Sequence, residues 1–317
     1  MRGGSPFSLW WAALLTGIVV LPFAIPPSMA TEVVIYGIVA VAANLLIGYA
    51  GLYSFGQAAF FGVGGYMTAN LLLHLDLPVL PALALGAVVS GLVAALVGFV
   101  CVRRTGIYFI MLTFAFNQMI FYIAYQWRDA TGGEDGLSGV PRPDVLGVDI
   151  GAPIAYYAFA ALVFVLCFWA MGRIVASPFG RIVVATRENP RRAASVGFDV
   201  TRAQTAIFAM SGAFTGLAGG LYAMLYGLMP IDAVNWINSG NIVFMVLIGG
   251  TGNLFGPAAG AVIFIILQDV LSVVWARWPL LFGAVVIAVV LYFQGGFVEL
   301  FHRLGRWATA RRKARAR

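Results

Sequence analysis

Side chains that could carry out acid–base or nucleophilic chemistry are sparse in this chain. The two histidines, His74 and His302, are far apart, and the motifs HExxH, GxSxG and CxxC and a Walker phosphate loop are missing. Cys101 and Cys167 lie in or beside apolar segments, which favours packing roles over a disulfide or a metal site. The sequence therefore predicts no catalytic residue, no metal and no cofactor.

Asp269 is the best candidate for a functional charge within the membrane. It follows Gln268 in an apolar segment, whereas Glu32 and Glu299 lie at the ends of their segments. A charge at depth in a bilayer is costly, so such a residue usually has a partner or faces a water-filled path. Asp269 also lies near the outer end of its segment, and a structural role is the alternative.

Amide side chains are the other candidates to line a solute path. They interrupt apolar segments at Asn44, Gln57, Asn117, Gln118 and Asn241. A carrier driven by protons or sodium is expected to hold charges near the midplane, whereas a path driven by a separate ATPase needs only mild polarity. The sequence favours the second arrangement. Each amide alone has a simpler interpretation, which is to satisfy the backbone of a neighbouring helix.

The composition excludes a soluble globular protein, because 62% of the 317 residues are hydrophobic and only 10% are charged. The formal net charge of +7 would suit a nucleic-acid partner, but the basic residues follow membrane topology and a C-terminal tail instead. We predict an all-α polytopic membrane protein with one transmembrane domain over residues 1–317, and no nucleic-acid partner.

Ten apolar runs have about the length that crosses a bilayer as a helix. They lie near residues 9–27, 32–49, 57–74, 79–100, 106–126, 152–172, 203–227, 234–249, 256–275 and 278–296. Glycines or polar residues interrupt the third, fifth and eighth runs. Each of these three is therefore either a full span, a half-helix or a re-entrant segment.

The basic residues are divided unequally between the two sides of this topology. Of nineteen, sixteen fall on the side of the termini, and only Arg128, Arg142 and Arg277 fall on the other. The rule that basic loops stay inside then places both termini in the cytoplasm. The acidic connection 127–151 suits the outer face, and the basic tail 303–317 suits anionic lipid headgroups.

The polar segment 177–197 carries its own helix signals. Ser177 can cap a helix that begins at Pro178, Asn189 can cap a second one that begins at Pro190, and Gly197 suits a helix end. We therefore predict two short helices that present a basic surface to a soluble cytoplasmic partner. A loop held against lipid headgroups would explain its arginines but not its caps.

Glycines at four-residue spacing predict close helix packing. They form two sets, Gly212, Gly216 and Gly220, and Gly252, Gly256 and Gly260. A face along which helices slide during transport is the alternative. The sequence Phe-Gly-x-Ala-Ala also occurs twice, at 55–59 and 255–259, which either marks a duplicated half or arises by chance in a chain rich in Gly and Ala.

Four stretches together resemble the LivM-type permeases of branched-chain amino acid ABC importers. They are GYAGLYSFGQAAFFGVGGYMTA at 48–69, TGGEDGLSGVPRP at 131–143, the segment 180–223 with RENPRRAASVG, and VLIGGTGNLFGPAAGAV at 246–262. The patterns TGGxDGLSGxP, RENPxxAxxxG and GGxGxxxGPxxGA in this order are specific, and the resemblance covers roughly residues 30–300.

The resemblance implies partners and a place for each motif. Such permeases are similar to type II importers, sit in the bacterial inner membrane, and work with ABC ATPases, a second LivH-type permease and an extracytoplasmic solute-binding protein. The matching coupling residues are Arg187, Glu188, Asn189, Pro190, Arg191, Arg192 and Gly197. The outer segment 131–143 would face the binding protein, with a lid over the path as the alternative.

The resemblance leaves the substrate open. Related permeases serve branched-chain amino acids, other amino acids, urea, short amides or aromatic acids, and nothing in the chain chooses among them. Two other classes compete with an ABC permease. A secondary carrier or channel would work without ATP, and a membrane enzyme would depend on Asp269, His74 or Glu32.

Overall fold

The computed structural model describes residues 6–145, 147, 149–251, 253–274, 277 and a few positions between 279 and 287. Most of the predicted span 278–296, all of the tail 303–317, and Gly252 lie outside the described residues. The long helices are α1 (Pro6–Ala24), α2 (Pro27–Asn44), α3 (Gln57–His74), α4 (Val79–Cys101), α5 (Ile107–Gln126), α7 (Pro153–Ala176), α10 (Val200–Tyr226), α11 (Trp236–Gly249) and α12 (Phe255–Val274).

Short elements connect these helices. They are α6 (Arg128–Thr131), α8 (Pro178–Glu188), α9 (Pro190–Ser195), the π-helix η1 (Leu45–Ala50), and the 3₁₀ turns η2 (Gly133–Asp135) and η3 (Ile231–Val234). The two-residue strands β1 (Leu137–Ser138) and β2 (Leu228–Met229) pair antiparallel, Leu137 with Met229.

The all-α polytopic membrane fold is confirmed. Each of the first nine predicted spans coincides with one of the long helices to within a few residues. Among the described residues, six segments are long and apolar enough to cross a membrane, at 27–50, 79–101, 107–126, 153–176, 200–226 and 255–273.

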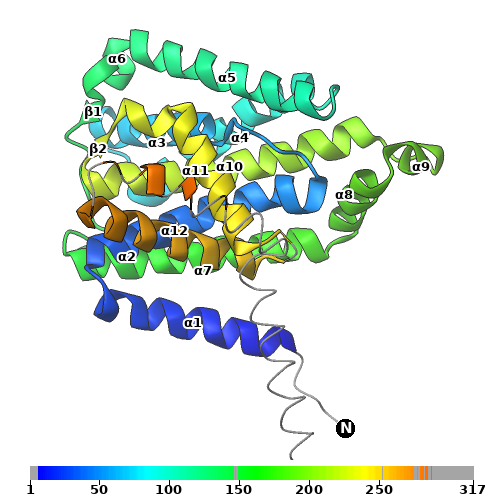
Figure 1. Ribbon diagram of the computed structural model, residues 1–317. Helices are drawn as coiled ribbons and strands as arrows, with labels where there is room; N and C mark the ends of the chain where they lie inside the picture. Colours follow the sequence, from blue (N-terminus) through cyan, green and yellow to red (C-terminus); the bar gives the residue numbers. More distant parts are fainter. Residues whose placement is uncertain are drawn as a thin grey trace, which may run out of the picture.

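The helices form a bundle whose two ends differ (Figure 1). Helices α8 and α9 project from one end, and α6 with the strand pair β1–β2 lies at the other. The basic segment 173–202 and the acidic segment 127–151 are therefore separated along the bundle, as the distribution of charge predicts.

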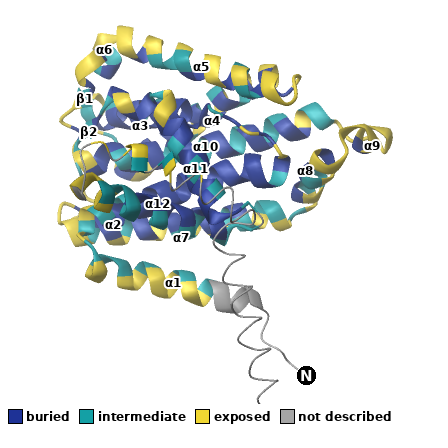
Figure 2. Cartoon of the chain, viewed as in Figure 1, coloured by how far each residue is buried: buried dark blue, intermediate teal, exposed yellow. Residues whose placement is uncertain are grey.

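Helix α2 is the centre of the bundle. Its span is 94% buried and packs against α7, α10, α11 and α12. Figure 2 shows the contrast with the outer helices, whose outward faces are exposed. On α4, α5 and α7 these faces carry large apolar side chains such as Leu96, Met111 and Leu162, which suits contact with lipid.

Two stretches of irregular backbone lead into the bundle. After η1 the chain reverses at the exposed Gly51 in a left-handed conformation (φ 71°) beside Arg187, and residues 52–56 then lead inward to α3, which begins beside the middle of α5. Helix α11 has only 14 residues, or about 21 Å at 1.5 Å per residue, too short for a hydrocarbon core of about 30 Å. The eighth predicted span is thus a half-helix entered through η3, whereas the fifth is a continuous helix.

The glycines of α10 allow three helices to approach closely, as predicted. A Cβ at Gly216 would collide with the Ser90 side chain on α4, and one at Gly220 would lie 2.6 Å from the Thr68 hydroxyl on α3. The Ser90 hydroxyl donates to the carbonyl oxygens of Phe60 (2.8 Å) and Gly212 (2.9 Å). Close approach therefore serves both dispersion contacts and hydrogen bonds between helices.

The second glycine set packs α11 against α12. A Cβ at Gly256 would lie 2.7 Å from the carbonyl oxygen of Gly249, and one at Gly260 would collide with the carbonyl of Met245.

The two Phe-Gly-x-Ala-Ala copies share a hydrogen bond from the backbone of their glycine to a preceding side chain. Side-chain oxygens of Ser54 and Asn253 accept from the backbone N–H of Gly56 (3.1 Å) and Gly256 (2.7 Å) near helix starts. The duplicated half stays a prediction.

Substitution of Gly216 by Val tests the tight contact between α10 and α4. We expect Gly216→Val to lower the thermal unfolding midpoint of the purified protein, because overpacking of this kind costs about 1–3 kcal/mol. Gly17→Val on α1 is the matched control, since no heavy atom lies within 4 Å of a Cβ there. Equal midpoints for the two variants would contradict the packing role of Gly216.

Candidate functional site

The segment between α7 and α10 folds as its caps predict. The Ser177 hydroxyl accepts from the Gly180 N–H (3.2 Å) at the start of α8, and Asn189 Oδ1 accepts from the Arg192 N–H (2.9 Å) at the start of α9. Gly197 follows α9 in a left-handed conformation (φ 94°), as expected for a helix end. The two short helices meet at Asn189–Pro190, where α8 packs against α7, η1 and α10 and α9 lies outermost.

The charged side chains of this helix pair point to solvent. Glu188, Arg191 and Arg192 are exposed, and within the described residues their side chains make no ion pair or hydrogen bond. Between α8 and α9 lies a concave site of about 370 Å³, which Glu188 and Arg192 share with Val196 and Phe198. A groove with charge and apolar surface suits a protein partner.

Val196 and Phe198 are functional candidates that the sequence reasoning missed. Val196 is 71% exposed and Phe198 41% exposed, although both are apolar and lie outside the long apolar helices. The available signal was a pair of apolar residues flanking Gly197 in an otherwise polar segment. Exposed apolar side chains of this kind mark interaction sites.

Arg187 differs from the other predicted coupling residues because it reaches back to the bundle. Its guanidinium donates to the carbonyl of Gly48 in η1, and a Cβ on Gly51 would lie 2.9 Å from Arg187 Cγ. Asn44 at the end of α2 donates to the Asn253 carbonyl (3.0 Å), next to the start of α12. The helix pair is therefore tied to α2 and, through it, to the turn before α12.

Three of the predicted path amides are buried, and each is hydrogen-bonded. Gln57 donates to Ser211 (3.1 Å) and accepts from Thr215 (2.8 Å) on α10. Asn117 accepts from the Ala59 N–H (2.9 Å) and donates to the Val234 carbonyl (3.1 Å).

Asn117 satisfies backbone groups near the starts of α3 and α11, as the simpler interpretation expects, whereas Gln57 binds side chains of α10. Asn44 acts similarly through its bond to Asn253, although its Oδ1 has no partner in the described structure. Water is absent from the hydrocarbon core, so these backbone groups need protein partners. A role of Asn44, Gln57 and Asn117 in the solute path stays a prediction.

The other predicted path residues lie apart from this network. Gln118 is half-buried beside it, with a buried Oε1 that has no partner within the described residues. Asp269 is exposed on α12, near enough to Glu32 on α2 for their charges to interact. Asn241 lines a polar cavity on another side of α11.

That polar cavity has a volume of about 270 Å³ and lies between α2, α10 and the start of α11. Its lining consists of Tyr36, Tyr222, Pro230, Asp232, Ala233, Asn235, Ile237, Asn238 and Asn241. The Tyr36 hydroxyl donates to Asn238 Oδ1 (3.3 Å), and the Tyr36 and Tyr222 rings meet edge to face at 6.1 Å. Asn241 and the carboxylate of Asp232 both line this cavity.

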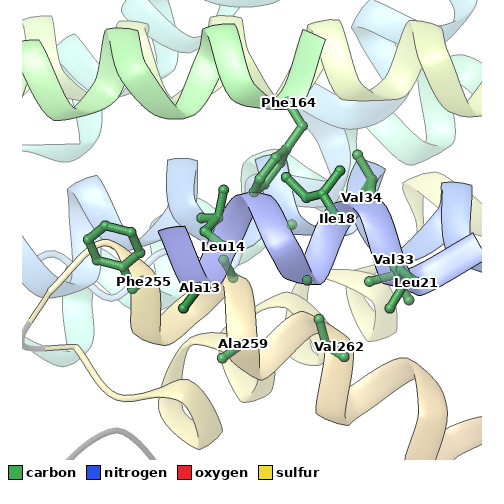
Figure 3. A pocket seen from close by; sticks show the side chains of 13 residues that line it. Ala13, Leu14, Ile18, Leu21, Val33, Val34, Phe164, Phe255, Ala259 and Val262 are labelled. Atoms are coloured by element: carbon green, nitrogen blue, oxygen red, sulfur yellow. The ribbon is translucent and has the colours of Figure 1, made fainter. Parts of the chain in front are cut away.

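An apolar pocket of about 290 Å³ lies between α1, α2, α7 and α12 (Figure 3). Leu14, Ile18, Val34, Phe164 and Val262 are among the side chains that line it, and none of its lining residues is polar. It offers a solute no hydrogen bond. In a membrane its chemistry suits a lipid acyl chain.

The segment 127–151, predicted to face outward, is pinned to the end of α10. Gly132, Gly133, Gly136 and Gly139 all have positive φ (75°, 67°, 75° and 83°), so they form the predicted tight turns. Arg142 Nε donates to the Met224 carbonyl (2.7 Å), and its guanidinium also donates to the Leu225 carbonyl. A cation at these last carbonyls stabilises the C-terminus of α10.

Comparison with known proteins identifies a family. The family described as "Branched-chain amino acid transport system / permease component" matches residues 25–293. A high-affinity branched-chain amino acid transport system permease protein LivM of Salmonella typhimurium is 26% identical over 92% of this chain and 75% of its own length. The protein of the same name in Escherichia coli is 24% identical over the same shares.

A third relative matches most of both chains. The probable branched-chain amino acid transport permease protein LivM of Methanocaldococcus jannaschii is 24% identical, over 83% of this chain and 90% of its own length. No solved structure matches the chain significantly.

Asn117 and Gln118 are adjacent amides, and we expect the loss of Asn117 to lower stability more than the loss of Gln118. We expect Asn117→Leu to destabilise the protein by about 1–3 kcal/mol for each buried group that loses its partner. Gln118→Leu is the matched control, because it removes a buried oxygen that has no partner in the described structure. Thermal unfolding of both purified variants makes the comparison, and an equal loss of stability would contradict the role of Asn117.

Proposed function

The chain belongs to the family of permease components of branched-chain amino acid transport systems, and on this premise we propose that it forms half of the solute path of an amino acid importer. Members of the family are permease subunits of ABC importers, which work with ATPase and solute-binding partners. The chain is therefore a multi-pass protein of the inner membrane. The observation that carries the proposal is the capped helix pair α8–α9 at the end of the bundle opposite the outer segment.

We assign α8 and α9 to the ATPase interface. Glu188, Arg191 and Arg192 supply charge, and Val196 and Phe198 supply apolar surface around the concave site. Two capped helices joined at Asn189–Pro190 would transmit movement of the ATPase to the membrane helices better than a flexible loop. Arg187 passes that movement to η1 and hence to α2, the buried centre of the bundle.

The outer segment 127–151 is assigned to the solute-binding protein. Strand β1 in this segment pairs with β2, which leads directly into Pro230 and η3. Docking of the binding protein would therefore act on the segment that lines the polar cavity. The same assignment places α8, α9 and both termini in the cytoplasm, in line with the distribution of arginines.

A second permease subunit is expected to face α2, α11 and the end of α10. Asp232 is exposed there and Asn235 and Asn241 are half-buried, and these polar side chains are unsuited to lipid. A LivH-type subunit is the proposed partner, with a second copy of this chain as the alternative. The solute path would then run between the two subunits.

The proposed solute is a branched-chain amino acid, from the substrate named for the relatives. Urea, short amides and aromatic acids are the alternatives within the same kind of importer. Uptake of radiolabelled leucine by proteoliposomes that hold the complete importer and its binding protein decides among them. Saturable, ATP-dependent uptake of leucine is the expected result.

Coupling is tested at the junction of α8 and α9. We expect Glu188→Lys to weaken the ion pairs with the ATPase, and Pro190→Gly to loosen the junction, so that each uncouples transport from ATP hydrolysis. The measurement is the number of solute molecules imported per ATP hydrolysed, and we expect a fall of about tenfold, the equivalent of roughly 1.4 kcal/mol.

A folding control accompanies both coupling variants. Each variant should insert normally and elute at the wild-type position in size-exclusion chromatography. Wild-type uptake per ATP in both variants would remove the coupling assignment from this helix pair.

A further inference from the structure

The polar cavity at the start of α11 carries a negative charge. Of its lining residues only Asp232 is charged, and this carboxylate makes no hydrogen bond or ion pair within the described part of the chain. It is exposed on a short turn between two membrane segments. Such a charge is stable at this position if water or a cationic group reaches it.

Within the described residues, the charged groups next to this surface are carboxylates. Glu32 accepts from the Tyr226 hydroxyl (2.8 Å), and the Tyr226 ring lies 4.7 Å from that of Tyr222 in the cavity wall. Asp269 interacts electrostatically with Glu32. The cation that touches the same end of α10, Arg142, is held by the Met224 and Leu225 carbonyls.

The cavity also offers hydrogen bonds that the protein does not use. Asn238 is held in place by Tyr36 (3.3 Å) and the Ala233 carbonyl (2.8 Å). Asn241, one turn further along α11, makes no hydrogen bond within the described residues through its side chain. The half-buried Tyr222 ring in the same wall can attract a cation as well.

We propose that this cavity is a water-filled station of the solute path that selects solutes with an ammonium group. Asp232 would attract the ammonium, Asn241 would bind the polar remainder of the solute, and the tyrosines would form the walls. A volume of about 270 Å³, near the lower end for ligand pockets of about 300–1,000 Å³, suits a solute of amino-acid size. Anionic aromatic acids are disfavoured.

This inference rests on the proposed role of the chain as a solute path, and its test does not depend on which solute is carried. Asn241→Cys is introduced into the complete importer in membrane vesicles, where Cys101 and Cys167 give little background because both are buried. The vesicles are treated with a positively charged ethylammonium and a negatively charged ethylsulfonate methanethiosulfonate. The rates of modification are then compared.

We expect the cationic reagent to modify Asn241→Cys faster than the anionic one, relative to their rates with free cysteine. Adding Asp232→Asn should reduce this preference by roughly fivefold or more, as expected of one nearby charge in a partly wet site. Asp129→Asn, which neutralises an exposed carboxylate outside the cavity lining, is the matched control and should leave the preference unchanged. Ile237→Cys, on the same wall, provides a second reporter if Asn241→Cys is poorly produced.

Leu96→Cys on α4 gives the modification rate expected of a cysteine that faces lipid, because Leu96 is 73% exposed on an apolar face. If Asn241→Cys and Ile237→Cys are as unreactive as Leu96→Cys, or if Asp232→Asn leaves the preference intact, the cavity proposal is overturned. The leucine uptake assay separates the two proposals. Cation-selective labelling without leucine uptake would support the cavity and contradict the amino acid substrate.

Discussion

The need to satisfy backbone hydrogen-bonding groups without water governs this structure. Continuous helices meet that need internally, but α3 and α11 begin inside the bundle and are entered through irregular backbone. Asn117 serves both breaks at once, since it binds the Ala59 N–H and the Val234 carbonyl. The polar core therefore exists because two helices are broken, and the breaks are what give a solute path irregular backbone at depth.

Close helix packing follows from the same need. Side chains as short as serine and threonine can bridge helices only if the backbones nearly touch, which the glycines of α10 permit. The resulting core is tightly packed around α2, α3, α4 and α10. The helix pair α8–α9 and the segment 127–151, which we propose as the two interaction surfaces, lie at opposite ends of this core.

Features with local causes could be predicted from the sequence, and features with distant partners could not. The caps at Ser177 and Asn189 lie within three residues of the groups they bind, and both appear as predicted. The places of nine helices follow from apolar run length, but run length does not tell the half-helix α11 from a full span. In contrast, Arg187 was expected to face a partner, yet it binds Gly48, which is 139 residues away. Likewise Asn241 and Asp232 can be recognised as one site only after α11 is seen to begin inside the bundle.

The π-helix η1 is a place where the chain could change its helical register by one residue. A π-helical turn contains one residue more than an α-helical turn, so its conversion to α-helix would move the following chain by about 1.5 Å and rotate it by about 100°. The carbonyl of Gly48 that receives Arg187 lies within this turn, and Gly51 ends it. A shift of register here would turn the stretch that leads into α3 by a fixed amount without unfolding any helix.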